Sequence, residues 1–151
     1  MKKLLVSSCL LGEKVKYNGK DNKLIASQLE KISKKYQIIS FCPEVEGGLP
    51  TPRVPCEAIS IDPLKIINKN GNEKTKEFIL GAKKTLELCK KENITIALLK
   101  ANSPSCSSEY IYDGTFTSTK IKNDGVTSAL LKKHNIKIYD ENKIDELLDE
   151  N

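Results

Sequence analysis

Short apolar runs alternate along this chain with longer stretches of helical spacing, and this alternation is what most limits its fold. The apolar runs predict buried strands at residues 3–7, 37–41, 95–100 and 136–139, with shorter strands at 58–62 and 65–68. Apolar residues with helical periodicity predict helices at residues 21–35, 73–92, 125–134 and 143–149. We therefore expect a single α/β domain over residues 1–151, with a mainly parallel sheet flanked by helices in a Rossmann-like three-layer arrangement.

The composition is that of an ordinary folded protein. Hydrophobic residues make up 38% of the chain and charged residues 30%. No stretch approaches the roughly 20 apolar residues that are needed to span a membrane. The apolar start of the chain breaks at Ser7-Ser8, before a secretory signal could form. We therefore expect a cytoplasmic protein without a membrane partner.

Three of the five cysteines follow predicted strands. The odd number of cysteines, without a secretory signal, argues against a disulfide framework. Cys9, Cys42 and Cys106 each lie within six residues of the end of a different strand. The carboxyl ends of parallel strands meet at one edge of a sheet, where ligands bind. We therefore expect these three thiols to share one site.

Three thiolates without a histidine favour an iron–sulfur cluster or a cysteine-rich zinc site. A structural zinc normally takes four ligands, often from CxxC pairs, and this sequence has no CxxC. The alternative is that the thiols are buried packing residues, which free cysteine often is. Cys89, on the apolar face of its helix, is interpreted in this way. Cys56, in the same loop as Cys42, is either a fourth ligand or a residue that does not bind metal.

The stretch from residue 42 to 57 contains four of the six prolines and predicts a rigid, irregular loop. Glu44 lies two residues after a candidate thiolate ligand, a position suited to proton transfer. Gly47 and Gly48 suit a tight turn or the close approach of a ligand to the backbone. Arg53 is the only arginine of the chain, which suggests a need for its planar, bidentate fork of donors.

Polar residues also precede the third thiol of the predicted site. Ser103 and Ser105 bracket Pro104 just before Cys106, and could donate hydrogen bonds to a substrate or to a cluster sulfide. Further along, residues 112–115 predict a turn between two short extended pieces. Residues 124–127 precede a helix whose N-terminal amides could receive an anion. Both of these features are also compatible with a purely structural role.

Two other classes of function find little support in the sequence. The only histidine, His134, ends a predicted helix, where the helix dipole favours it, so histidine-based hydrolases and zinc proteases are not expected. The net charge of +5 comes from scattered lysines without a dense basic run. RNA binding is therefore possible but not indicated.

Six short motifs, from residue 6 to about 131, follow the order of a known family. They are Val6-Ser7-Ser8-Cys9-Leu10-Leu11-Gly12; Lys16-Tyr17-Asn18-Gly19; Cys42-Pro43-Glu44-Val45-Glu46-Gly47-Gly48-Leu49-Pro50-Thr51-Pro52-Arg53; Leu99-Lys100-Ala101-Asn102-Ser103-Pro104-Ser105-Cys106; Tyr112-Asp113-Gly114-Thr115-Phe116; and Asp124-Gly125-Val126-Thr127. In these motifs the chain resembles the DUF523 family, whose characterised type is thiouracil desulfurase. It departs from the family pattern at Ser107, Asn18 and Cys56.

The resemblance implies a 4Fe-4S cluster held by Cys9, Cys42 and Cys106, with one iron left open. In the family this iron is thought to bind the thiocarbonyl sulfur of a substrate such as 2-thiouracil, so that water replaces sulfur as oxygen. An open iron is oxygen-labile, and an aerobic preparation is expected to lose the cluster. The resemblance makes Glu44 and Ser103 the candidate catalytic residues. The residues expected to bind substrate are Ser8, Gly47, Gly48, Arg53 and Ser105.

The leading prediction is an iron–sulfur-dependent desulfidase that acts on thionated nucleobases or nucleosides. The alternative is a non-catalytic metal- or cluster-binding module that senses redox state or binds thionucleotides or RNA. A simple thiol enzyme with Cys106 as nucleophile is a weaker third reading, because no histidine is available as its base. The sequence does not specify the oligomeric state.

Overall fold

Four parallel strands form the central sheet of the computed structural model, which describes residues 1–151. Their spatial order is β2-β1-β5-β8, and every neighbouring pair is parallel. The strands are β1 (Lys2–Ser7), β2 (Tyr36–Phe41), β5 (Ile96–Leu98) and β8 (Lys137–Tyr139). Parallel neighbours need long crossover connections, and the predicted helices provide them. The predicted parallel α/β domain is therefore confirmed.

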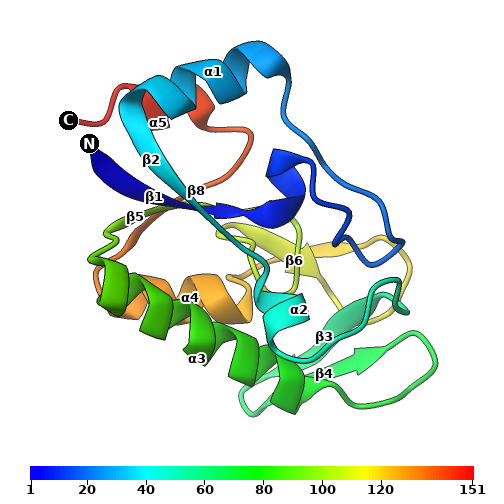
Figure 1. The fold of residues 1–151 in the computed structure, drawn as a ribbon. Helices are drawn as coiled ribbons and strands as arrows, with labels where there is room; N and C mark the ends of the chain where they lie inside the picture. The colour runs from blue at the N-terminus through cyan, green and yellow to red at the C-terminus, as the bar shows by residue number, and fades with distance from the viewer.

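Helices cover both faces of this sheet (Figure 1). The helices α1 (Ala26–Lys35) and α5 (Ile144–Leu148) lie on one face, and α3 (Thr75–Glu92) and α4 (Val126–Lys133) lie on the other. Along β1, Leu4 and Val6 belong to the core under α1 and α5, whereas Leu5 belongs to the core under α3 and α4. A strand that is buried on both faces needs an unbroken apolar run, which explains the sequence of β1.

Smaller elements extend the domain beyond the carboxyl edge of the sheet. They include the hairpins β3 (Cys56–Ile61)–β4 (Leu64–Asn68) and β6 (Tyr110–Tyr112)–β7 (Lys120–Lys122), the short helix α2 (Pro43–Glu46), and the 3-10 helix η1 (Ser8–Leu11). Phe78 of α3 packs in one core cluster with Ala58, Ile66 and Ile111. This third core joins both hairpins to α3 and fixes them as a wall.

The first helix begins later than its sequence pattern predicts. We expected it from residue 21, but α1 begins at Ala26. The Asp21 side chain accepts the N–H of Lys23 at 3.0 Å, and the N–H of Leu24 binds the carbonyl of Leu10 at 2.9 Å. These bonds compete with a helical ladder, because an Asx turn offers the backbone another partner. The segment is therefore held extended against η1.

The expected irregular loop at residues 42–57 also contains one regular element, the helix α2. Pro43 occupies its first turn, where the missing N–H costs nothing. Glu44 is thereby carried on a helical turn that directly follows β2.

No helix of the protein has the length and apolar character to cross a membrane.

Candidate functional site

The three predicted strand-end cysteines line one cavity at the carboxyl edge of the sheet. Cys9 lies in η1 directly after β1, Cys42 directly follows β2, and Cys106 lies in the loop after β5. The cavity has a volume of about 460 Å³, and its far wall is formed by the β3–β4 and β6–β7 hairpins. The parallel topology thus brings together thiols that are far apart in sequence.

Burial raises the pKa of each of these thiols. Desolvation is the largest cause at Cys9 and Cys42, where hydrogen bonds from the Asn22 side chain and the Val45 backbone partly oppose it. The pKa of Cys106, a residue that is 5% exposed, is raised most strongly by the same cause, and the charges of Cys42 and Cys9 add to it. Neighbouring thiolates therefore destabilise one another unless a cation or a metal group compensates their charge.

A small network of hydrogen bonds holds Cys106 in place. The Ser7 hydroxyl donates to the sulfur of Cys106 at 3.6 Å, and it accepts the N–H of Lys100 at 3.1 Å. The Ser103 hydroxyl accepts the N–H groups of Ser105 at 3.1 Å and Cys106 at 3.0 Å. The thiol thus sits on a turn whose backbone donors are satisfied.

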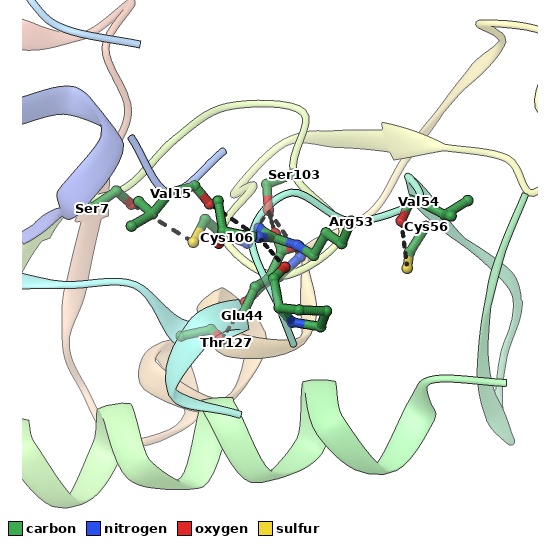
Figure 2. A network of polar contacts seen from close by, with 12 residues as sticks. Ser7, Val15, Glu44, Arg53, Val54, Cys56, Ser103, Cys106 and Thr127 are labelled. Atoms are coloured by element: carbon green, nitrogen blue, oxygen red, sulfur yellow. Dashed lines mark hydrogen bonds and ion pairs between the residues drawn. The ribbon is translucent and has the colours of Figure 1, made fainter. Parts of the chain in front are cut away.

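Glu44 and Ser103 point toward one another beside Cys106 (Figure 2). The Ser103 hydroxyl donates its hydrogen to Oε2 of Glu44 at 3.2 Å. The other oxygen, Oε1, accepts from Nε and Nη2 of Arg53 at 3.3 and 3.2 Å. Both oxygens of this carboxylate are therefore oriented by the protein, while Glu44 and Ser103 still line the cavity.

Nη1 of Arg53 also bonds to protein groups and does not point freely into the cavity. Its Nη1 donates to the carbonyls of Val15 and Pro50 and to the Thr51 hydroxyl, at 3.1 to 3.2 Å. The side chain is only 6% exposed. The bidentate use of its planar fork was expected, but its partner is Glu44. Arg53 lines the cavity and acts chiefly as a clamp between loops.

Three of the predicted substrate-binding residues lie outside the cavity lining. A Cβ on Gly47 would come within 2.1 Å of the Glu77 carbonyl, so this glycine is needed for packing against α3. Gly48 has a φ of +102° and turns the chain after α2. Ser105 is buried, and its hydroxyl bonds to that of Thr127 at 2.7 Å. The contacts of these three residues are structural, and the turn at Gly48 is one of the two roles expected for the Gly47-Gly48 pair. Ser8, in contrast, does line the cavity.

The N-terminus of α4 is occupied by the loop that carries Cys106. The N–H of Val126 binds the carbonyl of Pro104 at 2.9 Å, and the N–H of Thr127 binds that of Ser105 at 2.8 Å. The anion site considered at residues 124–127 is therefore filled by the protein's own carbonyls. These contacts instead fix the position of the third thiol.

The two other cysteines differ in their surroundings. Cys89 is 1% exposed in the core under α3, as its helical spacing predicts. Cys56 lies in the wall of the cavity, with its sulfur 3.7 Å from the carbonyl of Val54. Figure 2 shows it on the far side of Arg53 from Cys106. Burial raises its pKa to about 11. Nothing in this arrangement selects it as a fourth ligand.

The donor set fits an iron–sulfur cluster better than a single metal ion. No group of three or more histidine, cysteine or acidic side chains is close enough to hold one ion. The three thiols line one cavity instead, and cysteine thiolates are the ligands that hold iron–sulfur clusters. Cys9, Cys42 and Cys106 are thus the residues that could hold a 4Fe-4S cluster.

Several cavity residues carried no strong sequence signal. Ser7, Asn22, Lys100 and Glu57 all line the cavity. Ser7 and Lys100 lie inside two of the family motifs, but their partners are distant in sequence. Glu57 was assigned only to the end of a proline-rich loop. Its position becomes meaningful only when the second hairpin packs against it.

The comparisons with known proteins agree with this geometry. The model of the 2-thiouracil desulfurase family matches residues 4–143. A Bacillus subtilis (strain 168) protein described as the uncharacterized protein YbbK is 40% identical over 152 residues, covering 96% of this chain and 99% of the relative. The fold is therefore that of a desulfurase-type α/β domain, and this chain belongs to the 2-thiouracil desulfurase family.

A solved structure supports the same assignment. The 4Fe-4S-dependent thiouracil desulfidase TudS, a DUF523 protein, is 39% identical to this chain. The two structures align with a TM-score of 0.91 over 97% of this chain and 95% of TudS. The family predicted from the sequence motifs is thereby confirmed.

Proposed function

We propose that this protein removes sulfur from thionated nucleobases or nucleosides, with 2-thiouracil as the model substrate. Cys9, Cys42 and Cys106 would hold the 4Fe-4S cluster that this activity requires. The observation that carries the proposal is the convergence of these three thiols with the Glu44–Ser103 pair on one cavity. The name and cluster dependence of TudS agree with it.

The overall reaction replaces sulfur by oxygen without net oxidation. A thiocarbonyl and water give a carbonyl and hydrogen sulfide, so the two hydrogens of water end on sulfur. When bound, the cluster supplies an iron that carries no protein ligand and acts as a soft Lewis acid on the thiocarbonyl sulfur. The remaining task of the protein is to place a water beside the thiocarbonyl carbon and to move its proton.

Glu44 is the residue suited to that proton transfer. Its Oε2 accepts one hydrogen bond, from Ser103, and an ionised carboxylate oxygen has room for a second donor. A cavity water could occupy that position and lose its proton to Glu44 as the oxygen attacks carbon. Ser103 donates its only hydrogen to Glu44, so it fixes the direction of the base.

Metal content provides the first test. Anaerobic reconstitution should give a brown protein with about four irons and four sulfides per chain. Each of the single variants Cys9→Ser, Cys42→Ser and Cys106→Ser should lose this iron and sulfide. The matched control is Cys89→Ala, which removes a core thiol and should leave the iron content unchanged. Full iron content in all three serine variants would contradict the proposal.

Turnover provides the second test. The reconstituted protein should release one sulfide and form one uracil per 2-thiouracil consumed. No electron donor should be needed, because the reaction has no net redox change. A protein that binds its cluster but never releases sulfide from thionated bases or nucleosides would contradict the proposed activity.

A further inference from the structure

A second carboxylate, Glu57, lies in the wall of the cavity and is not used by the mechanism above. Its residue is 9% exposed. No lysine or arginine forms an ion pair with it, although eight other acidic residues of the chain have such a partner. Burying a carboxylate is costly unless hydrogen bonds replace its hydration. The contacts of Glu57 therefore need an explanation.

One oxygen of Glu57 holds the loop between β6 and β7. Oε1 accepts the N–H groups of Gly114 at 3.0 Å and Phe116 at 3.2 Å. Gly114 approaches β3 so closely that a Cβ there would lie 2.7 Å from the carbonyl of Ala58. The loop is thus fixed against β3, and it carries the Phe116 side chain into the cavity wall.

The other oxygen of Glu57 has no protein partner. No donor of the chain bonds to Oε2. Every fully buried side-chain oxygen of the protein does have a hydrogen-bond partner, so Oε2 cannot be one of the fully buried oxygens. Oε2 is therefore accessible, and Glu57 borders the cavity. Glu44 differs in this respect, since both of its oxygens are held by Arg53 and Ser103. Glu57 thus offers the cavity a fixed acceptor that is not already engaged.

We propose that Oε2 of Glu57 accepts a hydrogen bond from a ring N–H of the thionated base. This inference rests on the proposed function and narrows its substrate class. A thionated pyrimidine such as 2-thiouracil carries ring N–H donors, and an ionised carboxylate can only accept. A site built around such a bond rejects analogues that lack the donor. The substrates are therefore thionated rings with a free N–H. Phe116 lines the same wall of the cavity as Glu57.

The variant Glu57→Gln separates binding from loop support. The glutamine carbonyl can still accept the two loop amides, whereas its NH2 replaces Oε2, the acceptor proposed for the substrate. We expect a thermal midpoint close to that of the wild type and full iron content. The Kd for uracil, measured by anaerobic calorimetry on the cluster-loaded protein, should rise about tenfold or more. The KM for 2-thiouracil should rise in parallel.

N-methylated substrates test the contact from the other side. In the wild type, 1-methyl- or 3-methyl-2-thiouracil should lose at least tenfold in kcat/KM, whichever methyl blocks the bonded nitrogen. In Glu57→Gln this discrimination should largely disappear. The inference is overturned if active Glu57→Gln binds uracil as tightly as the wild type. It is also overturned if the wild type turns over both methylated substrates with the same kcat/KM as 2-thiouracil. Absence of sulfide release in the loaded wild type would instead overturn the proposed function, and this inference with it.

Discussion

Oε1 of Glu44 accepts hydrogen bonds from both Nε and Nη2 of Arg53, at 3.3 and 3.2 Å. The same guanidinium donates to the carbonyls of Val15 and Pro50. One side chain therefore joins the loop after η1 to the loop after α2 and fixes the direction of the carboxylate. Only arginine presents its donors in such a rigid fork, which accounts for the single arginine in a lysine-rich chain.

Removing the guanidinium of Arg53 should lower the stability of the protein as well as its rate of sulfide release. Arg53→Met leaves the carboxylate of Glu44, whose side chain is 17% exposed, without its partner. We expect the free energy of unfolding to fall by about 3 kcal/mol, the usual scale for breaking a buried pair. Denaturant unfolding of the cluster-free protein measures this. The control is Lys84→Met on the exposed face of α3, and equal stability of the two variants would contradict the clamp.

Arg53→Lys isolates geometry from charge. Lysine keeps the positive charge but cannot donate two parallel bonds to one carboxylate and also reach both carbonyls. We therefore expect at least a tenfold loss in kcat for 2-thiouracil with iron content unchanged. A lysine variant with wild-type kcat would show that Glu44 needs only a nearby charge.

Replacing the proposed base should remove turnover and spare the cluster. Glu44→Gln retains an amide oxygen for Arg53 but cannot take a proton from water. We expect sulfide release to fall by about 100-fold or more, the usual range for a lost general base. Iron content should stay near the wild type. Undiminished sulfide release in a fully loaded Glu44→Gln sample would assign the proton transfer to another group.

Ser103→Ala should act on both the base and the thiol loop. It removes the hydrogen bond to Glu44 and leaves the N–H groups of Ser105 and Cys106 without their acceptor. We therefore expect lower iron content in addition to slower sulfide release, which distinguishes it from Glu44→Gln. Iron analysis after identical reconstitution of the two variants makes the comparison.

The sequence predicted the sheet and the thiols for a simple physical reason. Buried parallel strands need continuous apolar runs, and the end of each run in β1, β2 and β5 marks a point on the same sheet edge. Cys9, Cys42 and Cys106 could therefore be placed together without a structure. Cys89 was separated from them by its helical spacing, and it does lie in the core.

The rest of the site depends on contacts that local patterns do not encode. Ser7 meets Cys106 across 99 positions of sequence, and Glu57 meets Gly114 across 57. Both contacts arise only when the hairpins and loops have packed. Gly47 shows the opposite case. Its local pattern suggested a tight turn or the close approach of a ligand, whereas the structure packs it against the backbone of α3.

Gly81 of α3 should be as important for the site as residues that line it. A Cβ at this position would lie 2.0 Å from the carbonyl of Pro43, which no side-chain rotation can relieve. Gly81→Ala should therefore push α2 away and displace Cys42 and Glu44. We expect a loss of about 1–3 kcal/mol in the free energy of unfolding, as for overpacked cores, together with poorer iron retention. Lys84→Ala on the exposed side of the same helix is the control.

The buried thiol of Cys89 should make the stability of the protein depend on pH. Burial raises its pKa from the ordinary value of 9.0 to about 11. Between these values the unfolded chain releases the thiol proton and the folded chain keeps it. The contribution of the protonated Cys89 thiol to the stability of the fold is therefore fully present below pH 9, and it is lost as the pH rises toward 11. Cys89→Ala lacks this effect, so its stability relative to the wild type should improve by about 2–3 kcal/mol over that range. Denaturant unfolding of both cluster-free proteins at pH 8 and 11 measures the change, since all other titrating groups are common to the pair. A constant difference between the two proteins at both pH values would show that the Cys89 thiol titrates alike in the folded and unfolded states.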